Sequence, residues 1–69
     1  MGKNIEKQIL EFVQNRHKID ESTTPRHIHI RFGLEMSRAE NILETLTQKN
    51  KILKFYDKDY QENRYMPAL

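Results

Sequence analysis

The stretch that decides the fold is FGLEMSRAE, residues 32–40. Gly33 can adopt the left-handed backbone conformation that commonly ends a helix. Ser37 and Glu40 have the S-x-x-E spacing of a capping box, in which each side chain bonds a backbone N–H of the other residue at the start of a helix. The stretch therefore predicts a helix that ends at Gly33, a short apolar turn, and a second helix that is capped by Ser37.

The helix that precedes this turn is predicted over residues 25–32. Thr24 is a suitable N-cap, and Pro25 suits the first helical position, where its missing N–H costs nothing. A strand over residues 27–32 is the alternative, because HIHIRF alternates polar and apolar residues and isoleucine is β-branched. We favour the helix because start and stop signals flank the segment. In a helix, Ile30 would lie opposite the apolar face, where a partner subunit could cover it.

Hydrophobic periodicity predicts the remaining elements. Residues 4–17 carry apolar residues at helical spacing, and residues 38–49 repeat this pattern in a narrower stripe. Asn50 suits the left-handed position after that last helix. Residues 52–66 then change to an apolar and aromatic pattern around a polar loop, which predicts a β-hairpin. The expected fold is mainly α with a hairpin, in the order α-α-α-β-β, and it leaves room for a short extra strand between the first two helices.

The composition limits the classes of protein to which this chain can belong. Its 69 residues predict a single domain, residues 1–69, with one small core. It has no cysteine, so disulfides and thiolate metal sites are excluded. No apolar run approaches the roughly 18–20 residues that span a bilayer, so we expect a cytoplasmic protein without a membrane partner. The net charge of +2 is a mild basic excess, and a nucleic-acid binder would have to gather its cations on one face.

Taken together, these stretches resemble the winged helix-turn-helix domain over residues 5–66. Residues 24–37 resemble the second helix and turn of prokaryotic regulators of the MarR, ArsR and LexA-like type, in which a Thr or Ser opens the helix and a Ser caps the next one. Residues 46–54 resemble the passage of this family from the third helix into the wing. Two positions depart from the family pattern: Asn50 replaces the usual Gly, and His29 replaces a small residue, usually Ala.

The resemblance implies that the third helix enters the major groove of DNA. There, Arg matches the acceptors of guanine, and Asn or Gln matches adenine. The free N–H groups at the start of the second helix could bind a phosphate, and basic residues of the hairpin could reach the backbone or the minor groove. Glu40 and Glu44 count against DNA, because a carboxylate repels phosphate. The candidate DNA contacts are Thr24, Arg26, Ser37, Arg38, Asn41, Thr45, Gln48, Lys54, Lys58 and Arg64.

We therefore expect a small sequence-specific protein that binds double-stranded DNA and acts as a transcriptional regulator. Its nonspecific binding should be weak and sensitive to salt, because few phosphates would be neutralised. A homodimer is expected, since two half-sites raise the affinity. We expect no catalytic residue, metal site, cofactor or small-molecule effector.

Two other interpretations remain open. The same fold can serve as a protein–protein adaptor that never binds DNA, and the mixed charge of the third helix favours this alternative. If residues 27–32 form a strand, the chain would instead be a mixed α+β module that binds RNA or protein.

Overall fold

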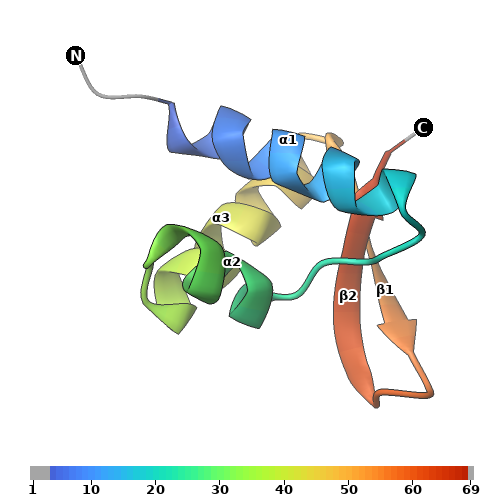
Figure 1. Ribbon diagram of the computed structural model, residues 1–69. Helices are drawn as coiled ribbons and strands as arrows, with labels where there is room; N and C mark the ends of the chain where they lie inside the picture. Colours follow the sequence, from blue (N-terminus) through green and yellow to red (C-terminus); the bar gives the residue numbers. More distant parts are fainter. Residues whose placement is uncertain (1–3, 69) are drawn as a thin grey trace.

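The computed structural model describes residues 4–68 and contains three helices followed by a hairpin. The helices are α1 (Ile5–Lys18), α2 (Pro25–Phe32) and α3 (Met36–Gln48), and the strands are β1 (Ile52–Asp57) and β2 (Glu62–Pro67) (Figure 1). This architecture confirms the predicted α-α-α-β-β fold class. Because α2 is a helix, the alternative of a strand over residues 27–32 is wrong.

Local signals at the helix ends place α1 and α2. The side chain of Asn4 caps α1 by accepting a hydrogen bond from the N–H of Lys7 at 3.2 Å. Thr24 is the N-cap of α2 and Pro25 is its first residue, while Gly33 ends the helix with a φ of +72°, as predicted. The bounds of α2 agree with the prediction, and those of α1 lie one residue later at each end.

The start of α3 differs from its capping motif. The helix begins at Met36, two residues before the predicted start, with Glu35 as its N-cap and no side-chain capping bond. Ser37 is therefore an exposed residue inside the first turn, and the predicted capping box with Glu40 is wrong. The reason lies in the turn, because Leu34 already packs against the core and only one residue separates it from the helix.

The end of α3 follows the prediction closely. The helix ends at Gln48, and Asn50 has the left-handed φ of +61° that its sequence position indicated. The N–H of Lys51 bonds the carbonyl oxygen of Leu46 at 2.9 Å, and the N–H of Asn50 bonds that of Thr47 at 3.0 Å. This pair of bonds is a Schellman motif, which satisfies the last carbonyl groups of the helix and turns the chain into β1.

The two strands pair in antiparallel orientation, and a tight turn joins them. Asp57 at the end of β1 lies opposite Glu62 at the start of β2. The side chain of Asp57 closes the turn by accepting hydrogen bonds from the N–H groups of Asp59 at 2.9 Å and Tyr60 at 3.3 Å. The hairpin thus covers residues 52–67, in agreement with the predicted 52–66.

The connector between α1 and α2 passes beside β2 (Figure 1). Thr23 donates its N–H to the carbonyl oxygen of Tyr65 at 2.9 Å, and Tyr65 donates its own N–H to Thr23 at 2.8 Å. The extra strand that the sequence allowed is therefore a single paired residue. The core lies between the helices and this small sheet, and its buried apolar residues are Ile9, Val13, Ile28, Ala39, Leu43, Leu46, Ile52 and Tyr65.

The two isoleucines of α2 provide a test of its orientation. Ile28 is fully buried and Ile30 is 78% exposed, whereas on a strand the two side chains would share one face. Ile28→Ala should lower the free energy of unfolding by about 2–5 kcal/mol, and Ile30→Ala should change it by less than about 0.5 kcal/mol. Urea unfolding at low protein concentration measures both values without a contribution from self-association. Similar losses for the two variants would contradict the helix.

Candidate nucleic-acid interface

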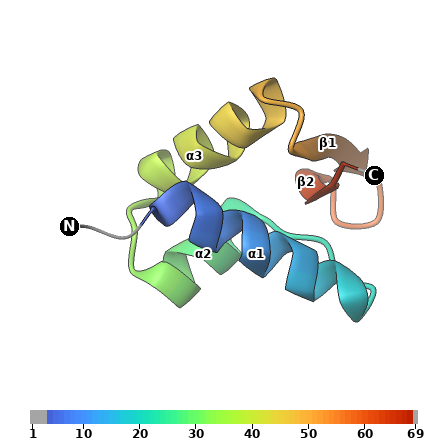
Figure 2. The same ribbon diagram turned by 90° about the horizontal axis from the view of Figure 1, so that it is seen from above.

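The helix α3 has one buried and one exposed face. Ala39, Leu43 and Leu46 point into the core. Seen from above, α3 lies along one side of the domain, and α1 and α2 lie together on its other side (Figure 2). Of the exposed residues of α3, Met36, Glu40 and Asn41 line a groove that also borders the start of α2, and Ser37, Arg38 and Gln48 lie outside it.

The outward face of α3 is polar and free of internal contacts. Ser37, Arg38, Asn41 and Gln48 are exposed, and Thr45 is half-buried. Within residues 4–68, none of these five side chains makes a hydrogen bond or an ion pair with another residue. Their hydroxyl, amide and guanidinium groups are therefore available to a partner outside the chain.

A groove of about 470 Å³ opens between α3, the start of α2 and the hairpin. Its charged lining consists of the carboxylates of Glu40, Glu44 and Glu62 and the cations of Arg26 and Lys54. The groove has more negative than positive side chains, so by itself it does not attract phosphate. Asn41 also lines this groove, so the groove is continuous with the outward face of α3.

Glu44 connects α3 to the hairpin. Its Oε2 atom accepts hydrogen bonds from Nζ of Lys54 at 2.8 Å and from the hydroxyl of Tyr65 at 2.7 Å. The bond from Lys54, followed by the bond from Tyr65, holds the pKa of Glu44 below its usual value. Burial, followed by the hydrogen bond to Glu44, raises the pKa of Tyr65. At neutral pH the carboxylate is therefore charged and the phenol protonated, which preserves both bonds.

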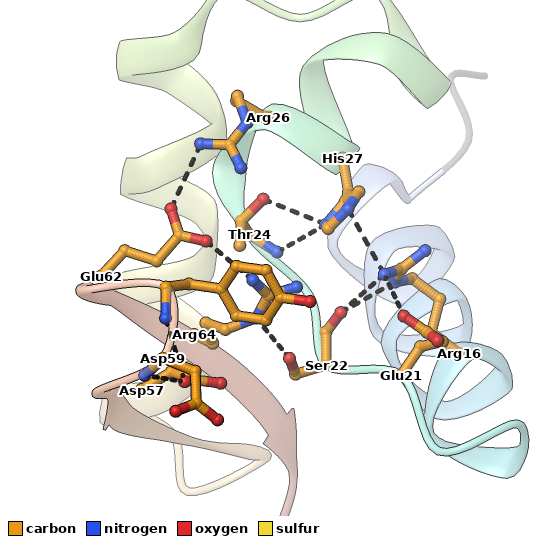
Figure 3. Close-up of polar contacts among 11 residues, drawn as sticks. Arg16, Glu21, Ser22, Thr24, Arg26, His27, Asp57, Asp59, Glu62 and Arg64 are labelled. Atoms are coloured by element: carbon orange, nitrogen blue, oxygen red, sulfur yellow. Dashed lines mark hydrogen bonds and ion pairs between the residues drawn. The ribbon is translucent and has the colours of Figure 1, made fainter.

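Glu62 holds two arginines at once (Figure 3). Its Oε1 atom lies 3.2 Å from Nη1 of Arg26, and its Oε2 atom lies 2.7 Å from Nη1 of Arg64. Arg64 is 6% exposed and also donates a hydrogen bond to the side chain of Ser22, while its guanidinium lies 4.5 Å from the ring centre of Tyr60. Arg64 thus joins β2 to the connector between α1 and α2.

His27 bonds back to the start of α2. Its Nδ1 atom accepts a hydrogen bond from the N–H of Thr24 at 3.0 Å, and its Nε2 atom lies 3.4 Å from Nη2 of Arg16 (Figure 3). Burial lowers the pKa of His27, and the neighbouring guanidiniums, Arg16 first, lower that pKa further. The ring is therefore neutral at pH 7, which leaves Nδ1 free to accept the bond from Thr24.

The five predicted contact residues outside α3 have different environments. Thr24 is 1% exposed and Arg64 is 6% exposed, and both side chains make hydrogen bonds inside the protein. Arg26 and Lys54 are exposed but each is paired with a carboxylate. Lys58 is exposed in the hairpin turn and has no ion pair within residues 4–68.

Two residues of this region were not identified by sequence reasoning. For His27 a signal existed, because it lies three residues after Thr24, where the side chain of a capping box bonds back to the N-cap. For Glu62 there was no signal, because Arg26 lies 36 residues away along the chain.

Residues 4–68 contain no group of three or more side chains that could hold a metal ion, and none of their helices is long and apolar enough to cross a bilayer. No protein-family model, curated protein or solved structure matches the chain. The function of this surface must therefore be inferred from its geometry and its chemistry.

The contact between His27 and Thr24 predicts a loss of stability in acid. Protonation would convert Nδ1 into a donor and place a positive ring beside guanidinium groups. Since the pKa of His27 is lower in the folded than in the unfolded chain, the unfolded chain binds a proton more readily. The free energy of unfolding should therefore fall as the pH drops below about 6.5 toward the folded pKa.

Thermal unfolding between about pH 7.5 and pH 5 measures this loss against the titration range of histidine. His27→Gln removes the titrating ring, and glutamine at this position can still bond back to the N-cap N–H. This variant should lose less stability in acid than the wild type. The same acid dependence in both proteins would show that His27 is not the responsible group.

Proposed function

We propose that this protein binds double-stranded DNA and that the outward face of α3 reads the base edges. The observation that carries the proposal is the polar, exposed face of α3, whose side chains have no partners within residues 4–68. An α-helix fits the major groove of B-DNA, where Asn41 and Gln48 can each pair with adenine and Arg38 can pair with guanine. The role that follows is that of a small transcriptional regulator of the winged helix-turn-helix type.

The hairpin supplies the second contact with DNA in this proposal. Lys58 is available in its turn, whereas Arg26 and Lys54 can contact phosphate only by leaving their carboxylate partners. Since Arg38 and Lys58 are the cations of α3 and the hairpin turn without an ion pair within residues 4–68, few phosphates are neutralised and nonspecific binding is weak. The logarithm of the binding constant should fall against the logarithm of the salt concentration with a slope of about −2 to −4 per chain, which corresponds to two to four neutralised phosphates.

We also propose that the protein binds DNA as a homodimer. Ile30 is 78% exposed on α2, and covering a large apolar side chain is favourable. Two copies would place two α3 helices on two half-sites and so raise the affinity. Sedimentation should give a particle of twice the 8.4 kDa mass of the chain, and a monomer at high concentration would contradict this part of the proposal.

A second candidate function is that of a protein–protein adaptor. The observation in its favour is the groove, where Glu40, Glu44 and Glu62 outnumber the cations and complement a basic peptide. An adaptor of this kind would bind its partner in the groove, which shares Asn41 with the outward face of α3, and would leave Arg38 and Gln48 unused. The two candidates therefore differ in whether Arg38 and Gln48 contact the partner.

Selection of duplexes from a random pool tests base recognition by α3. The wild-type chain should enrich a preferred sequence. Replacing Arg38 and Asn41 together, as Arg38→Ala with Asn41→Ala, should weaken binding of that duplex by about 1–3 kcal/mol for each lost base contact, which is roughly 5- to 150-fold, and should relax the preference.

The control is Gln14→Ala, which removes an exposed amide from α1 and should bind like the wild type. Circular dichroism should show that all variants keep their helices. If no sequence is enriched, or if the double variant binds like the control, α3 does not read DNA. A basic peptide that binds the wild type but not a variant with fewer groove carboxylates would then identify the adaptor.

A further inference from the structure

Glu62 joins two arginines that differ in how firmly they are held. Arg64 is almost completely buried and has Ser22 and Tyr60 as further partners (Figure 3). The side chain of Arg26 is 60% exposed, and its 3.2 Å contact with Glu62 is the one ion pair that it makes within residues 4–68. Of the two guanidiniums, Arg26 is therefore the one that can leave.

We propose that Glu62 is a built-in competitor of DNA phosphate for Arg26. This inference rests on the proposed function and concerns the regulation of the same surface. Carboxylate and phosphate each present a pair of acceptor oxygens that can take a bidentate contact from the guanidinium fork. In the free protein and on DNA of arbitrary sequence the carboxylate of Glu62 occupies Arg26, and in the complex with a preferred sequence a phosphate replaces it.

The geometry allows this exchange without leaving the carboxylate of Glu62 unpaired. When Arg26 leaves, Glu62 keeps its 2.7 Å contact with Arg64, so the carboxylate remains paired. The contact that is lost is an exposed ion pair, which is a weak interaction in water. Arg26 lies in the first turn of α2 and lines the groove beside α3, so its guanidinium is close to the surface that contacts DNA.

The competitor also explains how the domain limits nonspecific binding. A surface with permanently free arginines binds any duplex, because phosphate contacts carry no sequence information. While Glu62 occupies Arg26, a phosphate gains this contact only by displacing the carboxylate. Binding then depends more strongly on the base contacts of α3.

The test compares two variants that remove one negative charge from the same hairpin. Glu62→Gln removes the competitor but keeps an amide oxygen that can accept the bond from Arg64. Asp59→Asn is the matched control, since Asp59 is exposed and forms no ion pair within residues 4–68. Both changes raise the net charge by one unit, so a general electrostatic effect would be similar in the two variants.

Fluorescence anisotropy with a labelled duplex of arbitrary sequence gives the readout. Glu62→Gln should bind about two- to fivefold more tightly than Asp59→Asn, as expected for release from a weak exposed ion pair, and its salt slope should steepen by about one unit, as expected for one additional phosphate contact. Adding Arg26→Ala to Glu62→Gln should abolish this gain, while Arg26→Ala alone should weaken binding by less than about twofold, since Arg26 is already occupied.

Several outcomes overturn the proposal. Equal affinity of Glu62→Gln and Asp59→Asn for the duplex contradicts the proposal. An equal loss of affinity when Arg26→Ala is introduced into the wild type and into Glu62→Gln also contradicts it. If Glu62→Gln does not fold, Arg26→Ala is compared with Lys58→Ala, which also removes one positive charge. A loss from Arg26→Ala as large as that from Lys58→Ala then refutes the competition. Failure of the wild type to bind any duplex at low salt removes the proposed function itself and is a different result.

Discussion

The attachment of Tyr65 determines how the hairpin lies against the helices. A two-stranded hairpin is at best marginally stable alone and needs a third strand or a packed face. Here the backbone of Tyr65 pairs with Thr23 through two hydrogen bonds, its ring is buried in the core, and its hydroxyl donates to Glu44 on α3. One residue thus attaches β2 to the connector and to α3, which fixes the groove between them and leaves the outward face of α3 uncovered.

The parts of the fold that the sequence predicted are those that depend on local backbone chemistry. Gly33 and Asn50 both have positive φ, and Thr24 is the N-cap of α2. Each of these residues determines the backbone conformation only of its near neighbours in the sequence, so its effect can be predicted without the tertiary structure. The start of α3 shows the limit of such signals. Ser37 and Glu40 form a valid capping pattern, yet packing of Leu34 against the core brings the helix start forward to Met36.

The candidate site also has features that local sequence patterns predict and features that depend on tertiary packing. The exposure of Asn41 and Gln48 follows from a helical period of 3.6 residues and a known apolar stripe, so it was predictable. The burial of Arg64 was not, because strand alternation gives two faces without indicating which one another segment covers. The connector covers that face here, and Arg64 holds it through the hydrogen bond to Ser22.

Charge explains why α3, and not the groove, is the centre of the proposed interface. Glu44 and Glu62 neutralise Lys54 and Arg26, so these cations add little attraction while they are paired. A protein with weak electrostatic attraction must obtain its specificity from base contacts, and the five unpaired side chains of the outward face lie together on α3. In the proposed function the acidic groove limits nonspecific attraction, and the outward face of α3, which carries the cation of Arg38, supplies the base contacts.

The most direct measurement is a titration of the isotope-labelled protein with its selected duplex, followed by nuclear magnetic resonance. The account predicts that the side-chain amide signals of Asn41 and Gln48 and the backbone signals of α3 shift most, together with that of Lys58, while the signals of α1 remain in place. Shifts that concentrate on α1, or on the groove without the outward face of α3, would contradict it.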